Sequence, residues 1–242
     1  MIGRTGLLMV SLLLPLSASA APVEKGQLGC VLEPSMEVEV ASQVPGVAKL
    51  VYVGRGSKVR QGESLVLLET SLEEAVVALA NAKAKFAARK VERNKHLISQ
   101  GLLSAHERDE LVTEQHLAAL EVREAEARLK QRTIYSPING VVVARNINVG
   151  EYVSSDPILK LVRLNPLYAE IVMQADYYGS IKQGMKVGIK LGAPMKGQFT
   201  GTVTVVDQMI DAASATFGVR VEMPNPGFKV PAGLNCEVHF GL

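Results

Sequence analysis

The feature that most constrains the fold of this chain is an internal repeat. The first copy, residues 45–69, reads "PGVAKLVYVGRGSKVRQGESLVLLE"; the second, residues 139–163, reads "NGVVVARNINVGEYVSSDPILKLVR". The copies align without gaps at an offset of 94, and the matched positions include Gly46 with Gly140, Gly56 with Gly150, and Val59 with Val153. Each copy predicts a strand, a glycine turn and a second strand, because apolar residues alternate on either side of the turn.

One such unit would leave an apolar face exposed to water. We therefore expect the two copies to pack on each other as a split β-sandwich formed by residues 43–70 and 134–164. The segment that separates them, residues 71–133, has a different character, because it is rich in Ala, Lys, Glu and Leu and contains Gly101 as its single glycine and no proline. Long runs without these two residues favour helices.

This insertion predicts two helices, residues 71–100 and 104–133. Each begins with the pattern of a capping box, and Gly101 is placed to end the first helix; the two boxes are Ser71 with Glu74 and Ser104 with Glu107. Because only three residues join the helices, we expect them to lie antiparallel as a coiled-coil hairpin. At about 1.5 Å per residue, helices of this length make a rod roughly 43 Å long.

Heptad spacing predicts the contact surface between the two helices. On the first helix the repeating positions are Leu72, Leu79 and Phe86, with Ala75 and Ala82 between them; on the second they are Leu111, Ala118, Val122, Ala125 and Leu129. The first helix carries six basic and three acidic residues, and the second carries five basic and seven acidic. This opposite charge bias favours pairing of the helices.

The C-terminal third, residues 165–242, predicts a small antiparallel β-barrel. Short apolar-alternating runs are separated by glycine and proline, as is typical of such barrels; the runs are residues 167–173, 185–191, 199–206, 217–222 and 236–240. Upstream, residues 21–42 contain the alternating run "MEVEVAS", and we expect this N-terminal segment to add a strand to the barrel. The fold class is thus mostly β with one helical hairpin.

The first 20 residues are typical of a secretory signal peptide. Arg4 provides the positive charge, residues 7–16 the apolar core, and "ASA" at residues 18–20 the cleavage site, so we expect cleavage after Ala20 and export. The apolar run is shorter than the roughly 20 residues that span a bilayer. A lipoprotein alternative based on "QLGC" is disfavoured, because Gln27 occupies the position where a lipobox has an aliphatic residue.

Two cysteines, Cys30 and Cys236, would then lie in an oxidising compartment. A disulfide between them is chemically permitted there, and two buried free thiols are the alternative.

Composition and motifs exclude several classes of function. The formal net charge of +2, with no clustered basic excess, gives no indication of nucleic-acid binding. No phosphate-binding loop, G-x-S-x-G motif or Cys-x-x-Cys pair occurs, and the four histidines lack ligand spacing; they are His96, His106, His116 and His239. We therefore predict a protein that is not an enzyme and has no cofactor or metal site.

This order of parts resembles the periplasmic adaptor subunits of tripartite efflux pumps, also called membrane fusion proteins of the HlyD-like family. The resemblance covers approximately residues 28–242 and is carried by both copies of the repeat and by "QGMKVGIKL", "FTGTVTVVDQMID" and "VPAGLNCEV". It implies a lipoyl-like domain for the sandwich. It also implies an adaptor that assembles as a ring, with a hexamer expected, between an inner-membrane transporter and a TolC-like outer-membrane channel.

The resemblance assigns a role to "RNKHLISQGLLS" at the hairpin turn. Adaptors of this type carry an Arg-x3-Leu-x6-Ser pattern that docks onto the tip of the channel, and here Arg93, Leu97 and Ser104 have that spacing. Leu102 and Leu103 add apolar side chains to the same turn. Folding alone offers a second explanation for Ser104, as a helix cap, and for Arg93, as a solvated helix residue.

Other functions remain as alternatives. Larger family members have a fourth, membrane-proximal domain, for which we find no residues, and the barrel is the natural substitute for contacting the transporter. A lipoyl or biotinyl carrier is disfavoured because the helical insertion occupies the hairpin that would present the modified lysine. The cleavable signal and short hairpin favour a resistance-nodulation-division (RND) transporter partner, with an ABC exporter or a copper- or silver-type metal pump as alternatives. The sequence does not identify the exported substrate.

Overall fold

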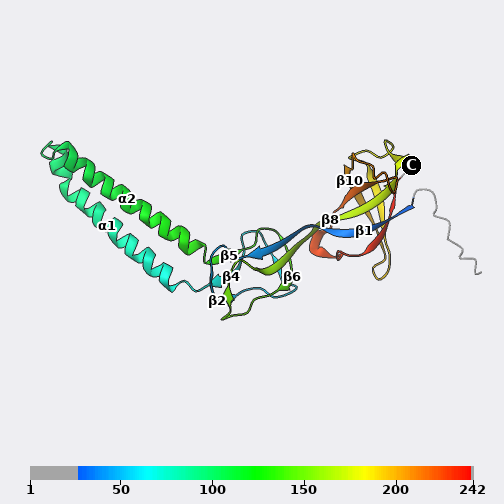
Figure 1. Ribbon diagram of the computed structural model, residues 1–242, viewed down its shortest axis with the longest axis horizontal. Helices are drawn as coiled ribbons and strands as arrows, with labels where there is room; N and C mark the ends of the chain where they lie inside the picture. Colours follow the sequence, from blue (N-terminus) through cyan, green and yellow to red (C-terminus); the bar gives the residue numbers. More distant parts are fainter. Residues whose placement is uncertain (1–26, 241–242) are drawn as a thin grey trace, which may run out of the picture.

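In a computed structural model of the chain, residues 27–240 are described, and three units follow one another along an elongated molecule (Figure 1). The helical hairpin lies at one end, the sandwich in the middle and the barrel at the other end. The signal-peptide prediction falls on residues 1–20 and lies outside the described residues. Among residues 27–240, none of the helices has both the length and the apolar character needed to cross a membrane.

Twelve strands and two long helices make up these units. The sandwich strands are β2 (Gly46–Val51), β3 (Lys58–Val59), β4 (Ser64–Leu68), β5 (Thr133–Tyr135), β6 (Gly140–Arg145) and β7 (Tyr152–Val153). The barrel strands are β9 (Lys186–Leu191), β10 (Gly197–Val206), β11 (Thr216–Met223) and β12 (Asn235–His239), with short 3-10 helices η1 (Ala175–Tyr177) and η2 (Pro226–Phe228). Two long strands, β1 (Gln27–Ala41) and β8 (Pro157–Gln174), run through both units. The five barrel strands predicted from the sequence are all present.

The internal repeat is a structural repeat whose two copies exchange strands. Gly46 and Val47 of β2 pair with Val153 and Tyr152 of β7. The equivalent residues of the second copy, Gly140 and Val141 of β6, pair with Val59 and Lys58 of β3. Neither copy can therefore complete its sheet without the other.

The glycine turns of the repeat have the same backbone conformation. Gly56 has φ +87° and Gly150 has φ +89°, a region that side chains with a Cβ avoid. Leu65, Leu68, Val142, Leu159 and Leu161, together with other aliphatic residues, form the core between the two sheets. The prediction of a split β-sandwich is confirmed.

Gly140 is the position of the repeat where a side chain is least tolerated. A Cβ on Gly140 would lie 2.3 Å from the carbonyl oxygen of Val162 in β8. We expect Gly140→Ala to lower the free energy of unfolding of the sandwich by about 2 kcal/mol, since overpacking against backbone forces the strands apart. Gly54→Ala is the matched control, because no atom lies within 4 Å of a Cβ there. Urea unfolding followed by circular dichroism checks both variants, and equal midpoints would contradict the expected result.

The barrel closes because β1 pairs with strands on both of its sides. The strand order runs β1-β12-β9-β10-β11-β8, and β8 pairs back onto β1. The barrel core contains Leu32, Leu167, Ile171, Ile189, Met223 and other apolar residues. Two of the methionines, Met173 and Met223, are fully buried in this core, which explains them as packing residues.

Strand β1 contributes to both units rather than to the barrel alone. Residues 27–31 of β1 pair with β12, and residues 30–41 pair with β8, with register shifts between Pro34 and Met36 and between Val40 and Ala41. Cys30 and Leu32 belong to the barrel core, whereas Val40 belongs to the sandwich core. The β1–β8 ribbon is consequently the main connection between the sandwich and the barrel (Figure 1).

Cys30 and Cys236 lie opposite each other on β1 and β12. The structure joins them as a disulfide with a Cα–Cα distance of 4.9 Å across 206 residues of sequence. Both side chains are buried. The bond therefore ties the first strand of the barrel to its last.

The two helices of the hairpin are α1 (Ser71–Ser99) and α2 (Ala105–Lys130). They are antiparallel, as predicted, and ion pairs link them at Lys83–Glu121 (3.2 Å) and Lys90–Glu114 (2.6 Å). Some of the opposite charges on the two helices are thus paired with each other within the hairpin.

The capping box predicted at the start of α1 is wrong. Thr70 is the N-cap residue, and Ser71 is already helical. Ser71 instead donates from its hydroxyl (2.8 Å) and its N–H (3.1 Å) to the carboxylate of Glu69. These two hydrogen bonds lower the pKa of Glu69 from 4.5 to about 2, and the bond from the Ser71 hydroxyl has the larger effect. Ser71 lies one residue too far along the chain to cap the helix.

The contact surface predicted for α1 is also wrong, whereas that for α2 is confirmed. On α2, Leu111, Ala118 and Ala125 are buried. On α1 the buried residues are Ala80 and Ala87, and the predicted positions Leu72, Leu79 and Phe86 are 71%, 60% and 51% exposed. Small alanines on α1 allow the helices to approach closely, which turns the larger side chains to the outside.

Candidate docking site at the hairpin tip

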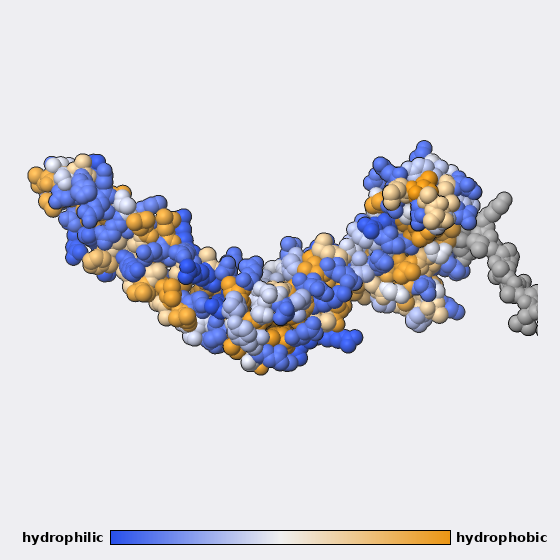
Figure 2. Space-filling view, in the orientation of Figure 1, coloured by the Kyte–Doolittle hydropathy of each residue, from blue (hydrophilic) through white to orange (hydrophobic). Residues whose placement is uncertain are grey.

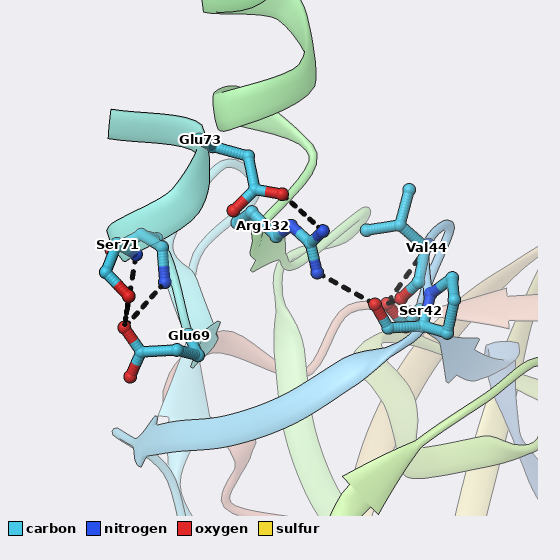
Figure 3. A network of polar contacts seen from close by, with 8 residues as sticks. Ser42, Val44, Glu69, Ser71, Glu73 and Arg132 are labelled. Carbon is cyan, nitrogen blue, oxygen red and sulfur yellow. Dashed lines mark hydrogen bonds and ion pairs between the residues drawn. The ribbon is translucent and has the colours of Figure 1, made fainter. Parts of the chain in front are cut away.

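The root of the hairpin holds both helices against the sandwich. Arg132, just beyond α2, forms an ion pair with Glu73 of α1 and donates to the carbonyl oxygen of Pro45 at 2.8 Å (Figure 3). The side chains of Arg132 and Glu73 are only 21% and 13% exposed, so solvent screens this pair less than a surface pair. One guanidinium thus connects α1, α2 and the sandwich.

The turn at the other end of the hairpin is a Schellman motif. Gly101 has φ +69°. The N–H of Gly101 donates to the carbonyl of Ile98 at 3.2 Å, and the N–H of Leu102 donates to the carbonyl of Leu97 at 3.0 Å. In this motif the residues at the positions of Leu97 and Leu102 are frequently both apolar. Part of the apolar character of the tip therefore has a folding explanation that sequence reasoning missed.

Ser104 caps α2 as predicted. Its hydroxyl accepts from the N–H of Glu107 at 3.2 Å and donates to the Glu107 carboxylate at 2.7 Å, which also accepts from the N–H of Ser104. These hydrogen bonds from the Ser104 hydroxyl and N–H lower the pKa of Glu107. The Ser104 side chain is thus engaged in the capping box.

The remaining tip residues are available for contact with another molecule. Leu102 is 65% exposed and Leu97 is 38% exposed, whereas Leu103 is half-buried. Arg93 is exposed one helical turn before Leu97 and forms no ion pair within residues 27–240. The candidate site therefore has an apolar end, Leu97 and Leu102, with an unpaired guanidinium beside it.

Within residues 27–240 no group of three His, Cys, Asp or Glu side chains could hold a metal ion. The polar side chains of the hairpin described above serve helix caps and ion pairs.

Comparison with known families identifies the class. Residues 36–162 match the family model described as the CzcB-like barrel-sandwich hybrid domain, and residues 169–242 match the CusB-like beta-barrel domain. The chain therefore belongs to the CzcB-like barrel-sandwich hybrid family. The second match covers the barrel, and relatives of the chain include proteins named as efflux pump periplasmic linker proteins.

Curated relatives carry names that refer to drugs, to metals and to antibiotics. The multidrug resistance protein MdtE of Escherichia coli is 26% identical over 230 residues, covering 81% of this chain and 58% of the relative. The nickel-cobalt-cadmium resistance protein NccB of Alcaligenes xylosoxydans is 26% identical over 242 residues, covering 90% and 60%. The antibiotic efflux pump periplasmic linker protein ArpA of Pseudomonas putida is 23% identical, covering 81% and 57%. The chain thus spans somewhat more than half the length of these relatives.

Solved structures share the fold. A MacA–MexA chimera that contains the Pseudomonas aeruginosa MexA α-hairpin superposes with a TM-score of 0.74 at 21% identity, covering 88% of this chain and 78% of the chimera. The membrane fusion protein Spr0693 from Streptococcus pneumoniae has a TM-score of 0.69 at 17% identity, covering 88% and 97%. The predicted fold class of sandwich, hairpin and barrel is confirmed.

Proposed function

We propose that this protein is the periplasmic adaptor of a tripartite efflux system, a linker without enzymatic activity. The observation that carries the proposal is the arrangement of three units in a row, with an apolar hairpin tip at one end and the barrel at the other (Figure 1). Such a molecule can contact one partner in the outer membrane and another in the inner membrane. Similarity to proteins named as efflux pump periplasmic linkers supports the same function.

Each end of the molecule has its own partner in this proposal. The tip, with Leu97, Leu102 and Arg93, docks onto a TolC-like outer-membrane channel, since apolar side chains and a guanidinium suit a surface of helix ends with exposed carbonyls. Leu103 and Ser104 support the turn that presents them. The barrel contacts an inner-membrane transporter of the RND type, and several copies form a ring, which we propose to be a hexamer, in the periplasm.

The class of exported substrate has two candidates. Drugs or other small molecules are one class, as the name of MdtE indicates for that relative. Metal ions are the second, as the name of the nickel-cobalt-cadmium resistance protein NccB indicates for that relative.

Cysteine crosslinking in cells tests the two contacts. We expect Leu102→Cys to form an adduct with the outer-membrane channel, and Met209→Cys, which is 81% exposed at the barrel, to form one with the inner-membrane transporter. The two native cysteines are disulfide-bonded, so each introduced thiol reacts alone. Val149→Cys, 62% exposed on the sandwich, is the control and should capture neither partner. Absence of the channel from the Leu102→Cys adducts would refute the docking role of the tip.

A further inference from the structure

A groove of 830 Å³ lies at the joint between the sandwich and the barrel. It is lined by the part of β1 that passes from one unit to the other, by strands β6 and β8, and by residues 231–233, the loop that precedes β12 of the barrel. In the space-filling view the molecule narrows at this joint, and apolar surface lies on both units beside it (Figure 2). Small-molecule sites favour such interfaces and typically have volumes of roughly 300–1,000 Å³.

Most of the groove is apolar. Val31 of β1, Val143 of β6 and Ala232 of the loop line it, together with the buried Val162 of β8. Val31 is 42% exposed, and Val143 and Ala232 are half-buried. These side chains would lose further contact with water if a ligand covered them, and burial of apolar surface favours binding. The groove therefore suits a ligand with a large apolar part.

One charge in the groove has no ion-pair partner. Of the ionisable side chains that line it, Glu37 and Lys160 form an ion pair at 2.8 Å. The third, Glu33, is exposed and forms no ion pair within residues 27–240, and the nearby Arg220 is paired with Glu170. The lining thus keeps one uncompensated negative charge, which complements a cation.

The loop side of the groove is held in place before any ligand arrives. The N–H of Gly233 donates to the carbonyl of Leu32 in β1 at 2.7 Å, and the Asn225 side chain bonds both backbone groups of Val230. Phe228 of the same loop has φ +59°, a conformation that bulky residues rarely adopt. Such strained residues cluster at ligand clamps and switch regions. The loop is therefore a preformed side of the groove.

We propose that this groove binds a lipophilic organic cation of the size of a drug molecule. Its apolar part would lie between Val143 of the sandwich and Ala232 of the barrel loop, and its charge beside Glu33. In the part of the chain that the structure describes, three potential metal-ligating side chains do not come together anywhere, so an organic cation is the class that fits. The linker function proposed above does not require this site.

Isothermal titration calorimetry of the full chain with two probes of the same shape tests the proposal. Tetraphenylphosphonium is a lipophilic cation, and tetraphenylborate is the matching anion. We expect tetraphenylphosphonium to bind saturably, one per chain, and about ten-fold more tightly than tetraphenylborate, because the exposed carboxylate of Glu33 attracts one probe and repels the other. Absence of saturable binding, or an anion that binds as tightly as the cation, would overturn the proposal.

Two pairs of variants locate the bound cation. Glu33→Gln should weaken tetraphenylphosphonium binding about three- to five-fold, as loss of one exposed charge pair does, whereas Glu126→Gln, which removes an exposed carboxylate of α2, should leave it unchanged. Val143→Lys places a positive charge in the groove and should weaken binding more than about ten-fold, since like charges repel at close range. Its control is Val205→Lys, the same change at a 41% exposed position of β10.

Hydrogen exchange provides a second readout, and circular dichroism verifies that each variant keeps its fold. Bound tetraphenylphosphonium should slow exchange both at residues 230–234 of the barrel and at residues 141–145 of the sandwich, because the ligand contacts both units. Full affinity in Val143→Lys would place the cation elsewhere, such as in the acidic groove of the hairpin beside Phe86, and would overturn the proposal.

These outcomes are separable from those of the crosslinking test. Failure of the binding measurements, with the channel adduct at Leu102→Cys retained, would remove the cation site and leave the adaptor function standing. Loss of that adduct with cation binding intact would refute the docking role of the tip and leave the groove as a binding site.

Discussion

Replacement of both cysteines, Cys30→Ala with Cys236→Ala, is expected to lower the free energy of unfolding of the barrel by about 4 kcal/mol, near the upper end of the usual range for one disulfide. The disulfide joins residues that are 206 positions apart, and a crosslink across a long loop removes much conformational freedom from the unfolded chain. It also connects β1 with β12, two strands that are otherwise held together by hydrogen bonds. The native barrel keeps these hydrogen bonds in the variant and should still form.

Urea unfolding under non-reducing conditions measures this effect. The chain has no tryptophan, so circular dichroism of the sheet and hydrogen exchange of β1 and β12 are the suitable signals. Wild-type protein treated with a reductant should match the double variant, and the helical signal of the hairpin should lose little stability because the hairpin lies far from the bond (Figure 1). Identical unfolding midpoints for oxidised wild type and the variant would show that the bond does not stabilise the barrel.

Asn225→Ala is expected to cost about 4 kcal/mol, since each buried polar group left without a partner costs about 1–3 kcal/mol. Asn225 is 2% exposed. Its amide donates to the carbonyls of Leu164 and Val230, both at 2.8 Å, and its side-chain oxygen accepts from the N–H of Val230 at 3.0 Å. Truncation leaves three backbone groups without these partners.

Because of the position of Asn225, its replacement by alanine should affect more than the hydrogen bonds of its own loop. Leu164 lies where β8 passes from the sandwich to the barrel, and the loop that Asn225 holds carries Gly227 and Phe228. Lys58 of the sandwich donates to the carbonyl of Gly227 at 3.3 Å and lies 5.3 Å from the centre of the Phe228 ring. Loosening of this loop should therefore also weaken the contact between the two units.

The matched control for this prediction is Asn235→Ala. Asn235 is an exposed residue of β12, and such surface substitutions usually change stability by less than about 0.5 kcal/mol. Urea unfolding compares the two variants, and hydrogen exchange at residues 225–230 reports on the loop. Equal stability of Asn225→Ala and Asn235→Ala would show that these buried hydrogen bonds contribute little.

The hairpin tip shows how much of a functional site the spacing of residues can predict. The spacing of Arg93, Leu97 and Ser104 indicated a docking site, and the structure shows that Ser104 and the Leu97–Leu102 backbone bond also belong to the turn itself. Apolar side chains that complete a helix end can also be presented to a partner. Hydrogen bonding distinguishes Leu102 from Ser104: both are exposed, but the Ser104 hydroxyl is engaged in its cap, whereas the Leu102 side chain is 65% exposed and apolar.

Local patterns in the sequence determined the elements of this protein. The repeat at an offset of 94 predicted two equivalent β-units, and the structure has matching positive-φ glycines at Gly56 and Gly150. Two long runs without glycine or proline, on either side of Gly101, predicted the helices. The Ser104–Glu107 pattern predicted the capping box of α2. Each of these features depends on backbone preferences within a few residues, which the sequence displays directly.

Only the tertiary structure decided which partner each element has. Two heptad rows were available on α1, and hydrophobicity favoured Leu72, Leu79 and Phe86; the structure buries Ala80 and Ala87 instead. The exchange of strands between the repeats and the pairing of β1 with β12 join residues far apart in sequence. Periodicity shows that a face is apolar, but the shape and distance of the surrounding elements determine what covers it.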